Sequence, residues 1–92
     1  SVQLFPNPFE ENTSLQLHSS SEGSVYYHIT NLLGQELFSN RLEVSKGINN
    51  WTISLKDLPQ GVYLLHINNN ILILIRTIIL IITIIHSLLI IN

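Results

Sequence analysis

The chain has 92 residues, contains no cysteine and carries a formal net charge of −2. This length suits one small domain, and the missing cysteine excludes a disulfide framework or a thiolate metal site. The charge argues against non-specific nucleic-acid binding, which needs a basic surface. The sequence has no alanine, and Ser, Thr, Asn, Ile and Val are plentiful, so the composition leans towards strands. Because it starts at Ser1 with neither Met nor an apolar leader, we expect it to be part of a longer protein.

A weakly alternating segment, Val2 to Phe5, opens the chain and stops at the motif Pro6-Asn7-Pro8-Phe9. Two prolines flanking an Asn cannot continue a strand ladder, so the motif predicts an extended turn. Phe9 is then placed to close one end of a core. The next residues, Glu10 to Asn12, predict a solvated turn.

Two alternating segments and a return strand come next. Residues 13–18 place Leu15 and Leu17 on the inner face, and residues 25–30 place Tyr27 and Ile29 there. The tetrapeptide Asn31-Leu32-Leu33-Gly34 has Asn first and Gly fourth, which is typical of a type I turn in a hairpin with a bulge. Residues 35–44 then form the returning strand.

The second half of the chain contains the segment that we expect to be central. Gly47 marks a turn, and residues 49–55 alternate with Trp51 inward. A second turn follows, with Pro59 at its first corner and Gly61 at its exit. Residues 62–67 are apolar on both faces, as in a central strand, and we assign the face of Tyr63 to the core.

Short strands at roughly ten-residue spacing, with no helical period, predict an all-β fold. We expect an Ig-like antiparallel β-sandwich of about seven short strands. The sandwich is predicted to occupy residues 1–76, followed by an Ile/Leu-rich tail of uncertain structure at residues 77–92.

The tail has three open readings. Residues 71–82 supply a last strand with an aggregation-prone extension, since repeated Ile favours β structure. Alternatively residues 71–91 span or contact a membrane, because about 20 apolar residues suffice. Against a span, Arg76 is costly near a bilayer centre, and no aromatic belt or basic flank marks an interface. The mixture of Ile, Leu and Asn also resembles a translated frameshift in AT-rich DNA.

Four motifs in one order resemble a known family. They are Leu4-Phe5-Pro6-Asn7-Pro8-Phe9, Asn31-Leu32-Leu33-Gly34-Gln35-Glu36-Leu37, Lys46-Gly47-Ile48-Asn49 and Leu58-Pro59-Gln60-Gly61-Val62-Tyr63-Leu64-Leu65-His66-Ile67. Together they are similar to the type A C-terminal sorting domain of the type IX (Por) secretion system of Bacteroidetes. The resemblance covers residues 2–68, and it implies a small Ig-like sandwich at the end of a larger secreted protein.

The resemblance implies a non-catalytic address tag without a cofactor. Its partners would be an upstream cargo domain, the type IX translocon and a sortase-like protease, and the cargo would cross the periplasm to the outer membrane and cell surface. The motif residues that define the shape are Pro6, Asn7, Pro8, Gly34, Gly47, Pro59, Gly61 and Tyr63. The family usually ends in a last strand with Lys or Arg, and here Arg76 is the one basic residue of that region, so we expect it to contact the translocon.

Other chemistry finds less support in the sequence. The four histidines, His18, His28, His66 and His86, favour surface imidazoles over a zinc site, which needs three or four converging ligands. His18 and His28 are predicted on outward positions of different strands, and no acidic residue lies at a helpful spacing. Asn7 and residues 10–12 favour a solvated turn over a calcium loop. No nucleophile elbow occurs, and the chain has one Asp, so a catalytic triad is not expected.

An adhesion module is the alternative function. A carbohydrate- or surface-binding sandwich attached to a secreted enzyme would use exposed aromatic side chains. Trp51 and Tyr27 lie on predicted core faces, which leaves Tyr26, next to His28 on the outer face, as the residue for such a contact.

Overall fold

The structure is a computed structural model that describes residues 1–77 and 86–89. These residues contain seven strands and one helical turn at residues 86–89. The strands are β1 (Val2–Phe5), β2 (Asn12–Ser19), β3 (Gly23–Thr30), β4 (Glu36–Val44), β5 (Gly47–Ser54), β6 (Gly61–Ile67) and β7 (Asn70–Arg76).

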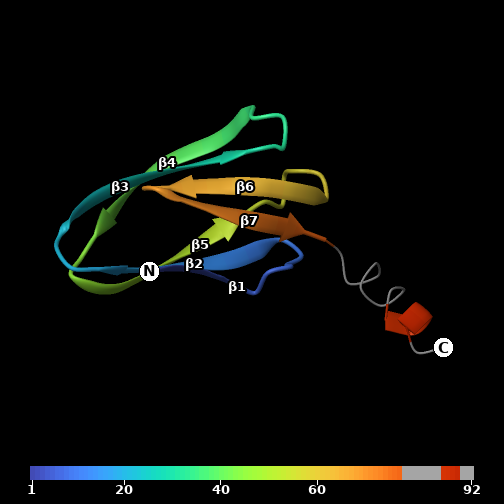
Figure 1. Ribbon diagram of the computed structural model, residues 1–92, viewed down its shortest axis with the longest axis horizontal. Helices are drawn as coiled ribbons and strands as arrows, with labels where there is room; N and C mark the ends of the chain where they lie inside the picture. Colours follow the sequence, from blue (N-terminus) through green and yellow to red (C-terminus); the bar gives the residue numbers. More distant parts are fainter. Residues whose placement is uncertain (78–85, 90–92) are drawn as a thin grey trace.

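The strands form two antiparallel sheets that face each other (Figure 1). One sheet has the order β1-β2-β5, and the other has the order β4-β3-β6-β7. The prediction of an all-β sandwich of about seven short strands is confirmed. Because β3 pairs with β6 across the intervening β4 and β5, the second sheet is built from distant parts of the sequence.

The core lies between the two sheets and consists of one side chain from every second strand position. The predicted inward faces of β2, β3 and β6 are confirmed, and Trp51 is half-buried and packs against the core. The core side chains are Phe9, Leu15, Tyr27, Ile29, Leu42, Ile53, Leu55, Tyr63, Leu65, Ile67 and Leu74.

Strand β6 is central, as expected, with β3 on one side and β7 on the other. The turn before it differs from the prediction. The hydrogen-bonded turn runs from Leu55 to Leu58, where the Leu58 N–H donates to the Leu55 carbonyl (2.9 Å), so it precedes Pro59. The Pro59 carbonyl instead accepts a hydrogen bond from the Tyr63 hydroxyl (2.5 Å), the arrangement known as a tyrosine corner.

The hairpin between β3 and β4 matches its predicted turn. The Gly34 N–H donates to the Asn31 carbonyl (3.1 Å), and Gly34 has φ +86°, which an L side chain rarely adopts. The Asn31 side-chain oxygen also accepts from the N–H groups of Leu33 (2.9 Å) and Gln35 (3.0 Å). The predicted bulge lies where the register shifts between Ile29 and Thr30.

The first part of the Ile-rich stretch forms strand β7, which confirms a last strand there. A two-residue turn at Asn68 and Asn69 joins it to β6, and Asn68 has a positive φ of 52°. Most of the predicted tail, residues 78–85 and 90–92, lies outside the described residues. In the part of the chain that is described, no helix has the length and apolarity needed to cross a bilayer.

Candidate recognition surface

The Pro6-Asn7-Pro8-Phe9 motif fastens the start of the chain to strand β7. The Asn7 side-chain amide donates to the Ile73 carbonyl (2.6 Å), and its oxygen accepts from the Ile75 N–H (3.0 Å). One primary amide thus satisfies a donor and an acceptor on the same strand edge, as the peptide group of a neighbouring strand would. Both Phe5-Pro6 and Asn7-Pro8 are cis peptides, and Asn7 lies between them.

Phe9 continues this contact along β7. Its N–H donates to the Ile75 carbonyl (3.0 Å), and its carbonyl accepts from the Thr77 N–H (2.8 Å), which makes a parallel bridge opposite Arg76. The Phe9 ring is buried in the core, as the sequence predicted. On the other side, the buried Thr13 hydroxyl donates to the Pro6 carbonyl (2.7 Å). We call these contacts of Asn7 and Phe9 with β7 the clasp.

Most of the motif residues lie at one end of the sandwich, where β7 ends (Figure 1). The clasp lies beside Arg76, which pairs with Gly61 at the start of β6. The Leu55–Leu58 turn borders the start of β4 in a cavity of about 230 Å³, so the β3–β4 hairpin with Gly34 is close by. Gly47, with φ +105°, lies at the opposite end, where β4 turns into β5.

Arg76 is half-buried and is bonded to the protein itself. Its Nε–H donates to the Leu55 carbonyl (2.9 Å), which fastens β7 to the turn before β6. A guanidinium group has five N–H donors, so this bond leaves others for a contact outside the domain. Arg76 therefore stabilises the end of the sandwich as well as presenting positive charge there.

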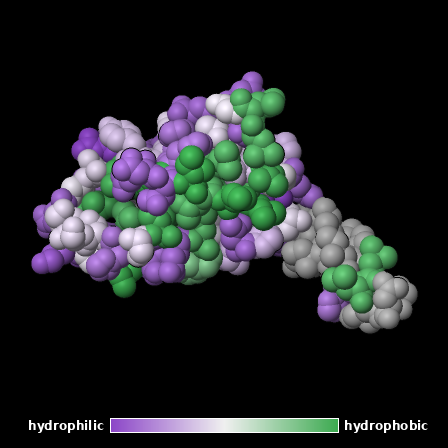
Figure 2. Space-filling view, viewed as in Figure 1, coloured by the Kyte–Doolittle hydropathy of each residue, from purple (hydrophilic) through white to green (hydrophobic). Residues whose placement is uncertain are grey.

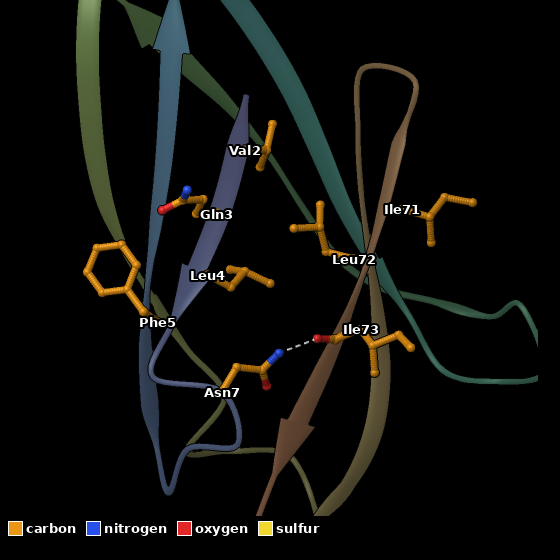
Figure 3. A pocket seen from close by; sticks show the side chains of 8 residues that line it. All are labelled: Val2, Gln3, Leu4, Phe5, Asn7, Ile71, Leu72 and Ile73. Carbon is orange, nitrogen blue, oxygen red and sulfur yellow. Dashed lines mark hydrogen bonds between the residues drawn. The ribbon is translucent and has the colours of Figure 1, made fainter.

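An open groove separates the edge strands β1 and β7 (Figure 3). Its volume is about 560 Å³, and among the described residues no charged side chain lines it. Leu4 and Leu72 point toward each other across the gap, whereas Ile71 and Ile73 point to the outside (Figure 3). We call this feature the seam groove, and it is lined by Val2, Gln3, Leu4, Phe5, Asn7, Ile71, Leu72 and Ile73.

Beyond the groove, the outer face of β6 and β7 is apolar apart from His66. Figure 2 shows this region as a continuous hydrophobic area. Three of its side chains are strongly exposed, namely Val62 (41%), Ile71 (64%) and Ile73 (55%). Across the two strands, Val62 pairs with Ile75, Leu64 with Ile73 and His66 with Ile71. An exposed apolar area on a small domain is typical of an interaction surface.

Two of the four histidines are not isolated surface groups. His28 and His66 are half-buried cross-strand partners, and their rings stack with centroids 4.4 Å apart and planes 3° from parallel. His66 Nε2 is also 3.0 Å from the Thr30 hydroxyl oxygen. His66 is therefore half-buried rather than fully exposed, because pairing of β3 with β6 brings the two rings together.

The aromatic side chains follow their predicted faces in part. Tyr27 is buried, and burial raises the pKa of its hydroxyl above the usual value near 10, with a hydrogen bond to Asn40 acting in the opposite direction. Tyr26 is 66% exposed and borders a shallow cavity of about 410 Å³. That cavity is lined by Ser24, Val25, Tyr26, His28, His66 and Asn68.

The described residues contain no group of three or more side chains placed to hold a metal ion. Asn7, which the sequence offered as an oxygen ligand, has its amide bonded to β7 on both sides. Glu10, Glu11 and Asn12 are exposed, as the solvated-turn prediction required. Asn7 therefore has a structural role, because its amide fastens the motif to β7.

Two features escaped the sequence analysis. The clasp joins residues 66 and 68 positions apart, and the His28–His66 stack depends on a pairing of non-consecutive strands. The sequence did contain a signal for the clasp. The prolines on both sides of Asn7 cannot donate backbone hydrogen bonds to a strand ladder, so the polar groups of this segment need partners elsewhere in the protein. The histidine stack gave no such local signal.

No curated protein and no solved structure matches the chain. The family model described as a secretion system C-terminal sorting domain matches residues 3–81, a range that includes β1 from Gln3 onward and the whole of β2 to β7. The chain therefore belongs to the secretion system C-terminal sorting domain family.

Proposed function

We propose that this domain addresses an attached cargo to the type IX outer-membrane translocon by presenting a folded surface, without chemistry of its own. Family membership makes the chain a sorting signal, so the protein that carries it is secreted toward the cell surface or beyond. The finer steps belong to the proposal. They are transit through the periplasm, recognition by the translocon and removal by a sortase-like protease.

The observation that carries the proposal is the convergence of the family motifs on one end of the sandwich. Asn7 and Phe9 bind β7, Arg76 binds the Leu55 carbonyl, and Gly61 pairs with Arg76. The contacts of Asn7 with β7 join residues 66 and 68 positions apart, so this surface exists only when the domain is folded. A translocon that reads it would accept folded domains and reject unfolded ones.

Within this surface we assign the direct contact to Arg76. Its guanidinium combines one bond to Leu55 with further donors, and it lies beside the clasp. The roles of Pro6, Pro8, Gly34, Gly47, Pro59 and Tyr63 are to hold the backbone and core that carry this end. Gly47, at the far end, would affect export only through folding.

Export of a fusion protein tests this proposal. Residues 1–92 are joined behind a fluorescent cargo in a bacterium with a functional type IX system. We expect cleaved cargo at the cell surface, and retention in a strain without the translocon. Arg76→Gln should reduce export, whereas Lys56→Gln, a charge change at an exposed turn position, should not. Retention of the unaltered fusion, or export without the translocon, would refute the proposal.

A glycan-binding adhesion module is the second candidate function. It is favoured by the exposed Tyr26 ring beside the cavity that contains His28 and Asn68. Binding of the isolated domain to a glycan array, with loss of binding in Tyr26→Ser, would support it. Absence of binding together with export of the fusion would leave the sorting role alone.

A further inference from the structure

The outer edge of β7 has a closed half and an open half. In an antiparallel ladder, alternate residues direct their N–H and C=O groups to the same neighbour. In the clasp, the Ile73 carbonyl and both backbone groups of Ile75 form hydrogen bonds with Asn7 and Phe9. The backbone N–H and C=O groups of the odd-numbered residues of β7 therefore face away from β6. Ile71 belongs to this set. Within the described chain, no hydrogen bond reaches the outward backbone groups of Ile71 or the Ile73 N–H.

The side chains on both sides of this open half are mostly apolar, with Gln3 and Asn7 in the groove and His66 opposite Ile71 as the polar neighbours. The seam groove lies on its inner side, with Leu4 and Leu72 facing each other, and Ile71 and Ile73 lie on its outer side (Figure 3). Unpaired backbone donors and acceptors between two apolar rows are what a β-strand presents to another strand. The same edge already accepts a strand-like partner in this molecule, since Phe9 pairs with it at Arg76, on the far side of Asn7 from the open half.

Two of the other edge strands, β4 and β5, carry polar or charged side chains, whereas β1 borders the seam groove itself. Strand β4 carries Glu36 and the exposed ion pair between Arg41 and Glu43 (3.1 Å). Strand β5 carries the exposed polar side chains of Asn50, Thr52 and Ser54. Charged and polar residues at edges discourage the addition of strands. The edge at Ile71–Ile73 lacks this protection.

We propose that the seam groove accepts an extended, uncharged segment of a partner protein, which adds to the sheet as a strand along Ile71–Ile73. Alternate side chains of the added strand would enter the groove between Leu4 and Leu72, and the others would cover Ile71 and Ile73. This inference deepens the proposed function, on which it rests for the partner's place in the export machinery. The clasp limits the added strand to the first half of β7.

Amide exchange with a defined peptide tests the site without any export assay. The probe is a synthetic peptide of alternating valine and threonine, and the control is the same peptide with proline in place of valine, which cannot complete a ladder. With the probe, we expect the Ile71 and Ile73 amides to exchange about tenfold more slowly, because a ladder hydrogen bond protects them. No change at millimolar peptide, or equal protection from the proline peptide, would overturn the inference.

A matched pair of variants links the groove to the peptide. Ile71→Lys puts a charge on the open edge, and Ile48→Lys makes the same change on β5 at nearly equal exposure, 65% against 64%. We expect Ile71→Lys to weaken peptide binding by about tenfold and Ile48→Lys to leave it unchanged, because an edge lysine opposes strand addition. Equal thermal unfolding of both variants excludes a folding defect. Equal peptide binding by both variants would contradict the proposal.

The same variants separate this inference from the proposed function in cells. If the unaltered fusion is exported and Ile71→Lys is retained while Ile48→Lys is exported, both ideas are supported. Export of all three fusions would remove the inference and leave the sorting role intact. Retention of the unaltered fusion would remove the sorting role, and the peptide experiment would then decide the strand site by itself.

Discussion

Asn7 illustrates how a polar motif residue can act through structure alone. Its amide joins two backbone groups of β7 that would otherwise face solvent or the groove. The sequence indicated that residues 6–9 interrupt a strand, because proline cannot donate in a ladder. It could not indicate the partner, because Ile73 and Ile75 lie 66 and 68 positions further along the chain.

The clasp makes a prediction for stability. Asn7→Ala removes two hydrogen bonds, so we expect the free energy of unfolding to fall by about 1–3 kcal/mol in urea titrations. Asn50→Ala is the control, since its side chain bonds Gln16 at an exposed site (3.3 Å). We expect that change to cost less than about 0.5 kcal/mol. Equal losses in the two variants would show that the clasp adds nothing beyond an ordinary surface contact.

Tyr27 makes a prediction for alkaline pH. Burial raises the pKa of Tyr27 in the folded state above its unfolded value near 10, so the neutral hydroxyl is favoured by folding. The stabilisation that comes from this preference for the neutral hydroxyl is fully present below pH 10, and it is lost as the pH rises through the raised pKa of Tyr27. We expect Tyr27→Phe to lose less stability than the unaltered chain between neutral and alkaline pH. Parallel stability curves for the two proteins would contradict this.

At the scale of elements, alternation in the sequence predicted most strands and their inward faces. Leu15, Ile29 and Leu65 were placed correctly because a strand has a period of two and needs no knowledge of its neighbours. The turn before β6 was placed too late, because the pattern of Pro59 and Gly61 outweighed the weaker local signal at Leu55–Leu58. The order of strands in a sheet carries no comparable local signal.

Strand β7 makes a prediction for hydrogen exchange in the free domain. Leu72 and Leu74 direct their N–H groups to β6, and the Ile75 N–H donates to Asn7. We expect these amides to exchange slowly and the Ile71 and Ile73 amides to exchange fast. Uniformly slow exchange along β7 would mean that the open half is already covered in solution.

At the scale of the whole molecule, the motifs and strand count were enough to identify the family and the sandwich. The convergence of motifs on one end was beyond the sequence, because it depends on how the two sheets face each other (Figure 1). The predicted boundary at residue 76 stays a proposal. It agrees with the position of the last backbone contact of the clasp, at Thr77.

A truncated chain tests this boundary. Among the described residues, every buried apolar side chain lies between Phe9 and Leu74. We therefore expect residues 1–77 to fold alone, with a single cooperative transition and a melting temperature within about 5 °C of the full chain. Circular dichroism on heating measures this. Loss of the cooperative transition would place essential packing beyond Thr77.

The clasp also has a consequence for how such a tag is made. A ribosome synthesises β7 after the six other strands, and without β7 the chain lacks Leu74 and the partner of Asn7 and Phe9. A nascent protein that ended before Asn70 would therefore carry an incomplete sandwich that lacks strand β7. If export requires the complete sandwich, only polypeptides translated through β7 would be exported. The tag would then report that synthesis of the protein had been completed.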